Sequence, residues 1–386
     1  MTKKILCILT VLLFSTSVKA TEIDEQHQIE SQALNESRKV WVSLPASYQR
    51  SKNAYPVLYV LDAQSHFTIT SQLATHLARS ERIPELIVVG IPLLESINLV
   101  RDRIRDYSPT HVKLEGEAAK GKPWQHSGRA HIFRQFIFDE VMPLIKSKYR
   151  TEPFNILAGH SQGGLFVTDT LLKGNDKINA YIAASPSFWW DNQVMVGKIT
   201  DWLNKPQSSA SYYFSLASGD RPAAQDPITQ VHELLNYQTP AAFYWKYDYF
   251  ANETHSSMVL KSYYEGLMHT FKHFAIPEAV RTAGIGAIKN HYQRLTKTLG
   301  YPLKPNEKRI NGLGYERMYN GELDGALAFF QWNVEQYPQS ANAQDSLAEG
   351  YFNSGENDNA IKHYQKSLAL NPKNSNAAKM LKKLKN

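Results

Sequence analysis

The sequence contains a complete G-x-S-x-G motif at residues 159–163. An apolar run over residues 154–158 precedes the motif, and residues 165–172 follow it with an apolar spacing that suits a helix. A serine between a strand and a helix lies on a strained turn, so its neighbours must be small, and the two glycines of the motif meet that demand. The turn also brings the serine close to a helix N-terminus, whose N–H groups can stabilise an oxyanion. Ser161 is therefore the predicted nucleophile, the alternative being a glycine- and serine-rich loop without chemistry.

The first twenty residues have the pattern of a secretory signal peptide. Lys3 and Lys4 precede an apolar stretch over residues 5–14, and Val18-Lys19-Ala20 forms a small-residue cleavage site. The apolar stretch is too short to cross a bilayer, and no other segment approaches the length that this requires. We therefore expect an exported protein, periplasmic or secreted, without a membrane span.

Composition limits the chemistry that the chain can perform. The only cysteine, Cys7, lies in the expected signal peptide, so the mature chain would have no thiol for disulfides, catalysis or metal binding. The formal net charge is +7, partly from lysines of the same segment, and no run of basic residues stands out. Nucleic acid is therefore not an expected partner. No metal or organic cofactor is expected either.

Strand-like and helix-like segments alternate through residues 21–275. Apolar, strand-like runs occur at residues 40–45, 55–62, 86–91, 154–158, 180–184 and 212–216, and residues 130–149 have helical periodicity. This alternation predicts one α/β domain, in which a mainly parallel sheet has helices on both faces.

The pattern changes beyond residue 275. Residues 276–306 predict a helical linker, and five positions then recur after 34 residues: Leu313 and Leu347, Gly321 and Gly355, Ala326 and Ala360, Phe330 and Tyr364, Pro338 and Pro372. This spacing is typical of tetratricopeptide repeats, which are pairs of helices. Residues 307–386 therefore predict a small all-α region of two repeats and a capping helix. Since two repeats rarely stand alone, we expect them to pack on the preceding domain.

A serine hydroxyl needs a base that takes its proton, and that base needs a carboxylate to orient it. His255 follows a strand-like run and lies in a polar loop, where a mobile imidazole belongs, so it is the predicted base. The other histidines after the motif fall in helical patterns or in the linker and repeats: His232, His269, His273, His291 and His363.

The orienting carboxylate should follow the strand-like run at residues 212–216. Asp220 and Asp226 both lie in the loop after it, and Asp220 is closer to the strand end. Asp226 could equally cap the next helix, because Pro227 follows it. Asp220 is preferred, and both stay candidates.

Stabilising an oxyanion requires two backbone donors. One should be the N–H of Gln162, directly after the nucleophile. The second is expected from the loop after residues 55–62, at Ala63 or Gln64.

Together these motifs resemble the putative esterase family, which includes esterase D (S-formylglutathione hydrolase) and the enterochelin-type siderophore esterases. The resemblance covers about residues 26–275 and rests on residues 38–45, 55–67, 89–91, 105–110, 159–163, 185–190 and 253–257. It implies an α/β-hydrolase fold, with Ser161 as nucleophile and His255 as base. Two departures matter: Ala63 stands where the family often has glycine, and Pro222 stands where its acid usually lies. The second departure keeps both aspartates open.

Three further residues are candidates for binding the substrate. Trp189 and Trp190 follow the strand after the motif, and the resemblance implies aromatic and basic contacts to a catecholate there. Both tryptophans could equally fill the core. Arg105 could bind an anionic substrate or form a structural ion pair.

The leading hypothesis is an exported serine hydrolase that cleaves carboxylic esters. Its substrates could be siderophore trilactones, carbohydrate-linked acyl esters or short-chain esters. An acyltransferase with the same residues is an alternative. A second alternative is an interaction protein, whose repeats recruit a partner or a second copy while the α/β domain serves as scaffold.

Overall fold

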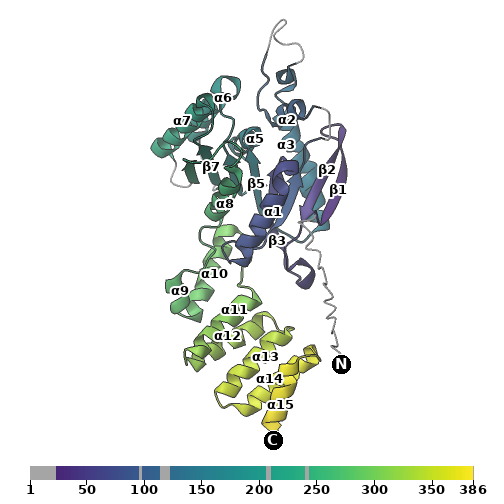
Figure 1. Ribbon diagram of the computed structural model, residues 1–386, viewed down its shortest axis with the longest axis vertical. Coiled ribbons are helices and arrows are strands. Elements are labelled where there is room, and N and C mark those ends of the chain that lie inside the picture. Colours follow the sequence, from purple (N-terminus) through teal and green to yellow (C-terminus); the bar gives the residue numbers. More distant parts are fainter. Residues whose placement is uncertain (1–22, 95–97, 114–121, 206–209, 240–242, 386) are drawn as a thin grey trace, which may run out of the picture. The chain divides into compact units, whose positions relative to one another are not determined.

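The computed structural model describes residues 23–94, 98–113, 122–205, 210–239 and 243–385. The expected signal peptide lies outside these residues. The chain divides into two compact units, Met1–Phe271 and Lys272–Asn386. The first contains the whole sheet, and the described part of the second is entirely helical (Figure 1).

The first unit is built on one sheet with the strand order β1-β2-β4-β3-β5-β6-β7-β8. The strands are β1 (Glu25–Ser31), β2 (Glu36–Ser43), β3 (Tyr55–Leu61), β4 (Ile87–Ile91), β5 (Thr151–His160), β6 (Ala180–Ala184), β7 (Ser211–Ala217) and β8 (Tyr244–Phe250). β1 pairs with β2, and β2 with β4, in antiparallel fashion, while all other pairs are parallel. The mainly parallel α/β fold predicted from the alternating pattern is confirmed.

Helices cover both faces of this sheet. The helical segments of the first unit are η1 (Tyr48–Arg50), α1 (Ala63–Arg79), α2 (Leu99–Tyr107), η3 (Pro123–His126), α3 (Ala130–Phe136), the π-helical turn η4 (Ile137–Val141), α4 (Met142–Lys148), α5 (Gln162–Leu172), α6 (Trp190–Leu203), α7 (Pro222–Gln238) and α8 (Val259–Thr270). α1 and α8 pack against each other on one face, and α2, α3, α5 and α6 lie on the other (Figure 1). Every residue of β3 is buried, because the strand lies between these two layers.

Close packing of α8 on the sheet depends on Gly266. A Cβ atom at this position would lie 2.6 Å from the side chain of Ile182 in β6, so any larger residue would push the helix away. The position of α8 matters because the loop in front of it carries His255.

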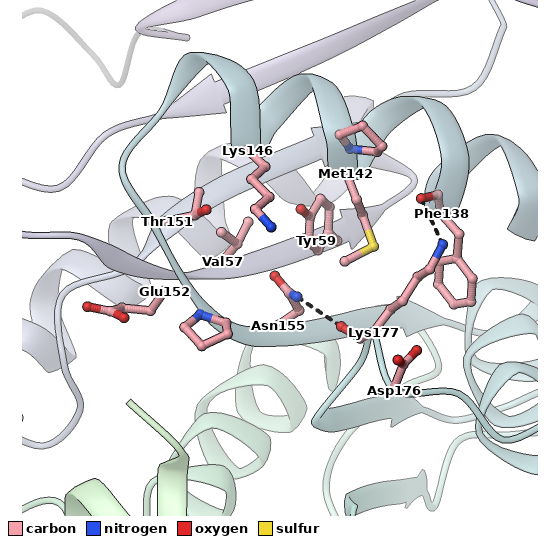
Figure 2. Close-up of a pocket in the computed structure, with 12 residues that line it drawn as sticks. Val57, Tyr59, Phe138, Met142, Lys146, Thr151, Glu152, Asn155, Asp176 and Lys177 are labelled. Carbon is pink, nitrogen blue, oxygen red and sulfur yellow. Dashed lines mark hydrogen bonds between the residues drawn. The ribbon is translucent and has the colours of Figure 1, made fainter. Parts of the chain in front are cut away.

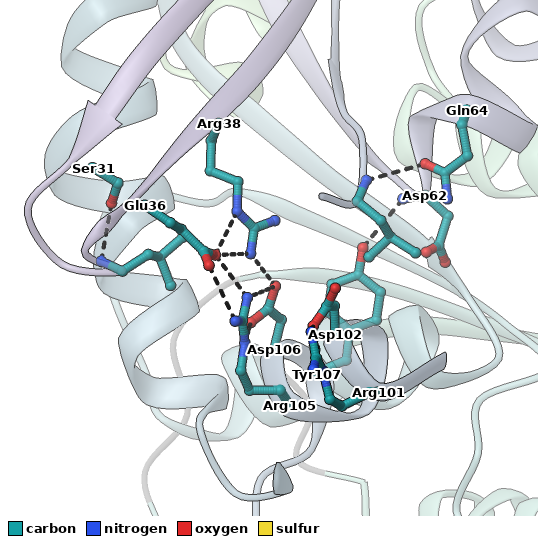
Figure 3. Close-up of polar contacts among 12 residues, drawn as sticks. Ser31, Glu36, Arg38, Asp62, Gln64, Arg101, Asp102, Arg105, Asp106 and Tyr107 are labelled. Atoms are coloured by element: carbon teal, nitrogen blue, oxygen red, sulfur yellow. Dashed lines mark hydrogen bonds and ion pairs between the residues drawn. The ribbon is translucent and has the colours of Figure 1, made fainter. Parts of the chain in front are cut away.

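A buried ion network joins β2 to α2 (Figure 3). Arg38, only 2% exposed, contacts both Glu36 and Asp106, and Arg105 binds the same two carboxylates. Removing one member would leave a buried charge without its partner, at a cost of about 3–5 kcal/mol. The network therefore fixes the antiparallel edge of the sheet on the helix that borders the candidate site.

The second unit consists of helical hairpins. Its helices are α9 (Glu278–Thr282), α10 (Ile285–Leu299), α11 (Glu307–Tyr319), α12 (Leu323–Gln336), α13 (Ala341–Asn353), α14 (Asn357–Leu370) and α15 (Ser375–Lys385). The segment predicted as a linker is helical, and α10 shares an apolar cluster with α11 and α12. Gly321 and Gly355 occupy the turns after α11 and α13 with φ of +80° and +79°, which explains why glycine recurs after 34 residues. None of the helices described in either unit has the length and hydropathy needed to cross a bilayer.

Candidate active site

Ser161 lies between the last residue of β5 and the first residue of α5. Its φ of 58° and ψ of −115° are unusual for a residue other than glycine, so the backbone is strained there. The turn closes tightly, because a Cβ at Gly159 would lie 2.6 Å from the backbone of Gly163. The glycines of the motif are thus required by this close approach. The hydroxyl of Ser161 is partly exposed and forms a 3.2 Å hydrogen bond with that of Ser187.

The Nδ1 atom of His255 is hydrogen-bonded to a carboxylate oxygen of Asp220. Asp220 follows β7 and His255 follows β8, and these two strands are parallel neighbours, so their carboxyl ends meet. The other oxygen of Asp220 accepts hydrogen bonds from the hydroxyl of Ser185 at 2.7 Å and from the N–H of Ala217 at 3.2 Å.

These bonds decide the charge of Asp220, which is 6% exposed. Burial alone would raise its pKa, but the hydrogen bonds from His255 and Ser185 outweigh burial and hold the pKa below its ordinary value. Asp220 is therefore a charged carboxylate that is hydrogen-bonded to the imidazole. Asp226, the other candidate, is exposed and is the fifth residue of α7, whose N-cap is Arg221, so it does not cap that helix either.

Ser161 and His255 line the same pocket, which has a volume of about 540 Å³. Its other lining residues are Asp62, Gln64, Ser65, His66, Leu93, Leu99, Val100, Arg103, His160, Ser256 and Val259. Four of them are aliphatic, and Leu99 and Val100 at the start of α2 are 47% and 59% exposed. Part of the pocket wall is thus an uncovered apolar surface. No group of three or more His, Cys, Asp or Glu side chains in the described part of the chain could hold a metal ion.

The two expected oxyanion donors are the first residues of helices at the same edge of the sheet. Gln162 begins α5 and Ala63 begins α1, and the strands before them, β5 and β3, are parallel neighbours. The first N–H groups of a helix have no partner within the helix. The two turns also lie close together, because a Cβ at Gly163 would be 3.3 Å from a carboxylate oxygen of Asp62. The side chain of Gln64 accepts a hydrogen bond from the N–H of Leu93 at 3.1 Å.

Arg103 connects these two turns, a role that the sequence did not reveal. Its guanidinium donates three hydrogen bonds of 2.9–3.1 Å to Asp62, which immediately precedes Ala63. It also donates a 2.8 Å bond to the carbonyl of His160, which immediately precedes Ser161. Asp62 itself has a φ of 52°, so this clamp holds a strained residue. Arg103 lies between other arginines in the sequence, and only the fold distinguishes it from them.

Two further histidines, also unforeseen, belong to the pocket wall, with His160 beside His255 and His66 beside His160. The ring of His160 lies 4.4 Å from that of His255 and 5.6 Å from that of His66, measured between centroids. Burial, reinforced by the neighbouring His255, lowers the pKa of His160 well below its ordinary value. Burial also lowers the pKa of His66. At neutral pH this part of the wall is therefore uncharged imidazole.

The three residues expected to bind substrate do not line this pocket. Trp190 is 1% exposed, and its indole N–H donates to the hydroxyl of Thr110 at 3.1 Å. Trp189 is partly buried beside it. Arg105 is held by Glu36 and Asp106 in the ion network (Figure 3). These positions suit the alternatives, which are core packing for the tryptophans and a structural ion pair for the arginine, and substrate binding by these residues stays a prediction.

Two known family models match this chain. A family model described as "Putative esterase" matches residues 31–270, which is more than half of the chain. The chain belongs to this esterase family. A second model, described as "Tetratricopeptide repeat", matches residues 341–374 of this esterase, which is the helical pair α13 and α14.

Relatives of this esterase include named siderophore esterases. It is 28% identical to the ferri-bacillibactin esterase BesA of Bacillus subtilis over 248 residues, which are 61% of this chain and 85% of that protein. It is 30% identical to the siderophore enterobactin esterase of Emericella nidulans over 204 residues, 49% of this chain and 66% of that protein. A solved structure of an IroE-like serine hydrolase from Shewanella oneidensis superimposes with a TM-score of 0.70 at 26% identity, covering 81% of this chain and 99% of that one.

Proposed function

We propose that this esterase is an exported serine hydrolase, which cleaves carboxylic esters through an acyl-enzyme on Ser161. One observation carries the proposal: Ser161 and His255 line the same pocket. Ser161 is strained and partly exposed, and His255 is bound by Asp220. Export is inferred from the pattern of the first twenty residues.

In the proposed reaction His255 is the general base. Asp220 accepts the Nδ1–H, so Nε2 is free to take the proton of Ser161 as its oxygen attacks the ester carbonyl. The carbonyl oxygen becomes an oxyanion, which the N–H groups of Gln162 and Ala63 stabilise. The intermediate collapses when protonated His255 gives its proton to the leaving alcohol. Water then attacks the acyl group in the same way, releasing the carboxylic acid and restoring Ser161.

The substrate is proposed to be a siderophore-type ester or another acylated small molecule. The names of the relatives from Bacillus subtilis and Emericella nidulans support the first class. The volume of about 540 Å³ is within the range of small-molecule sites. The uncovered Leu99 and Val100 favour esters that bring an apolar group against this wall.

Hydrolysis of p-nitrophenyl acetate and butyrate by the purified mature protein tests the proposal. We expect turnover by the wild type and its loss in Ser161→Ala and in His255→Ala, with unchanged circular dichroism. His76→Ala, on the exposed side of α1, is the matched control and should behave as wild type. Activity that persists in Ser161→Ala would refute the acyl-enzyme.

A further inference from the structure

A second cavity, of about 510 Å³, opens at the opposite edge of the sheet (Figure 2). It is lined by Val57 and Tyr59 of β3, by residues 151–153 and Asn155 of β5, by Phe138, Met142, Pro143 and Lys146 of η4 and α4, and by Asp176 and Lys177 before β6. It involves the amino-terminal half of β5, whereas Ser161 follows the carboxyl end of that strand. No residue lines both this cavity and the candidate active-site pocket.

Tyr59 is a buried polar group without a protein partner. It lies in the middle of the fully buried β3 and is 2% exposed. No hydrogen bond of its hydroxyl is recorded among the described residues, and burial is the one cause that raises its pKa. The hydroxyl is thus a neutral donor that faces the cavity and is available to a ligand there.

Lys146, an exposed residue of α4, lines the same cavity and brings a positive charge to it. Figure 2 shows its side chain reaching from α4 toward the side of Tyr59. Within the described ranges no carboxylate pairs with its ammonium, whereas the ammonium of Lys177 is already bound by Asp139 at 3.0 Å and by the carbonyl of Phe138 at 3.2 Å. The side chain of Glu152 points away from Lys146 in the same view. Two convergent donors, one of them cationic, suit a carboxylate.

The rest of the cavity wall is partly polar, with Thr151, Glu152, Asn155, Asp176 and Lys177, and partly apolar. Val57, Met142 and the ring of Phe138 form the apolar part, together with two prolines. A ligand that uses both features has a carboxylate at one end and an apolar body at the other. We propose that this cavity binds a small apolar carboxylate, held by Lys146 Nζ and the Tyr59 hydroxyl, with its body against Met142 and Phe138.

Calorimetric titration of the full mature chain with benzoate tests the proposal. Tyr59→Phe removes only the hydroxyl, and we expect it to weaken binding about fivefold. Lys146→Met removes the charge and should weaken binding tenfold or more. Lys148→Met, an exposed lysine on the same helix, is the matched control and should leave the dissociation constant unchanged. Benzyl alcohol, which lacks the carboxylate, should bind at least tenfold more weakly than benzoate.

Other outcomes would overturn the proposal. One is failure of benzoate to bind at millimolar concentration, and another is equal binding of benzyl alcohol and benzoate. Unchanged affinity for benzoate in both Tyr59→Phe and Lys146→Met would also overturn it. Binding that Leu99→Ser weakens and Lys146→Met does not would locate the carboxylate in the candidate active-site pocket instead. Because Tyr59→Phe removes a hydroxyl that binds no described residue and keeps the ring, its thermal midpoint without ligand should equal that of wild type, so weaker binding cannot be attributed to unfolding.

Discussion

Replacing Arg103 by methionine should damage both stability and catalysis, for separable reasons. The side chain of Asp62 is 4% exposed and that of Arg103 25% exposed, so the substitution leaves a buried carboxylate without its cation. Breaking such a pair costs about 3–5 kcal/mol, and partial exposure of Arg103 places the expected loss near the lower value, about 3 kcal/mol. Urea unfolding measures this loss.

The catalytic effect comes from the two backbone donors. Arg103 ties the residue before Ala63 to the residue before Ser161, so its loss should let the two proposed oxyanion donors move apart. A misplacement of about 1 Å lowers rates about 100-fold, and we expect kcat on p-nitrophenyl butyrate to fall by about that factor with a smaller change in KM.

Two further variants separate these effects. The double variant Asp62→Asn with Arg103→Met removes the orphaned charge and should regain most of the stability, while kcat stays low. Arg103→Lys should restore part of the stability, because it keeps the charge without the fork of hydrogen bonds. If Arg103→Met loses stability but keeps the wild-type kcat, Arg103 supports the fold alone and the reasoning about the donors is wrong.

Three other predictions concern the same pocket. Asp220→Asn should lower kcat/KM about 10³–10⁴-fold, whereas Asp226→Asn should not change it; equal effects would reject the assignment. Leu99→Ser should reduce hydrolysis of p-nitrophenyl octanoate more than of the acetate, because each buried CH₂ contributes about 0.8 kcal/mol. The control Leu260→Ser, 44% exposed on α8, should keep the wild-type ratio of the two rates. Unfolding free energy should fall from pH 7.5 to 5.5, because the lowered pKa of His160 means that the unfolded chain binds a proton that the native chain refuses. A urea series should show a smaller fall for His160→Gln, and an unchanged pH dependence would contradict this cause.

The elements that sequence predicted best are those with a strong local pattern. The continuous apolar run at residues 55–62 became β3, and the 34-residue spacing became successive helical hairpins. β1 was not predicted, because its residues 25–31 are mostly polar and form a strand only by pairing with β2. Likewise, the helical pattern over residues 130–149 gave no sign of the π-helical turn at η4.

The candidate site shows the same division between local and long-range information. The strained turn at Ser161 could be predicted, because the motif itself demands it. The choice between Asp220 and Asp226 could not be made from the sequence, because it depends on β7 and β8 being neighbours in the sheet. The roles of Arg103 and His160 were equally hidden, since their partners are far apart in the sequence.

Labelling with a fluorophosphonate, followed by peptide mass spectrometry, tests the proposed acyl-enzyme most directly. The account predicts one stoichiometric adduct on the peptide that contains Ser161, in parallel with loss of ester hydrolysis. The adduct should be absent in Ser161→Ala and should form far more slowly in His255→Ala. An adduct on another residue, or full hydrolytic activity in protein whose Ser161 is labelled, would contradict the account.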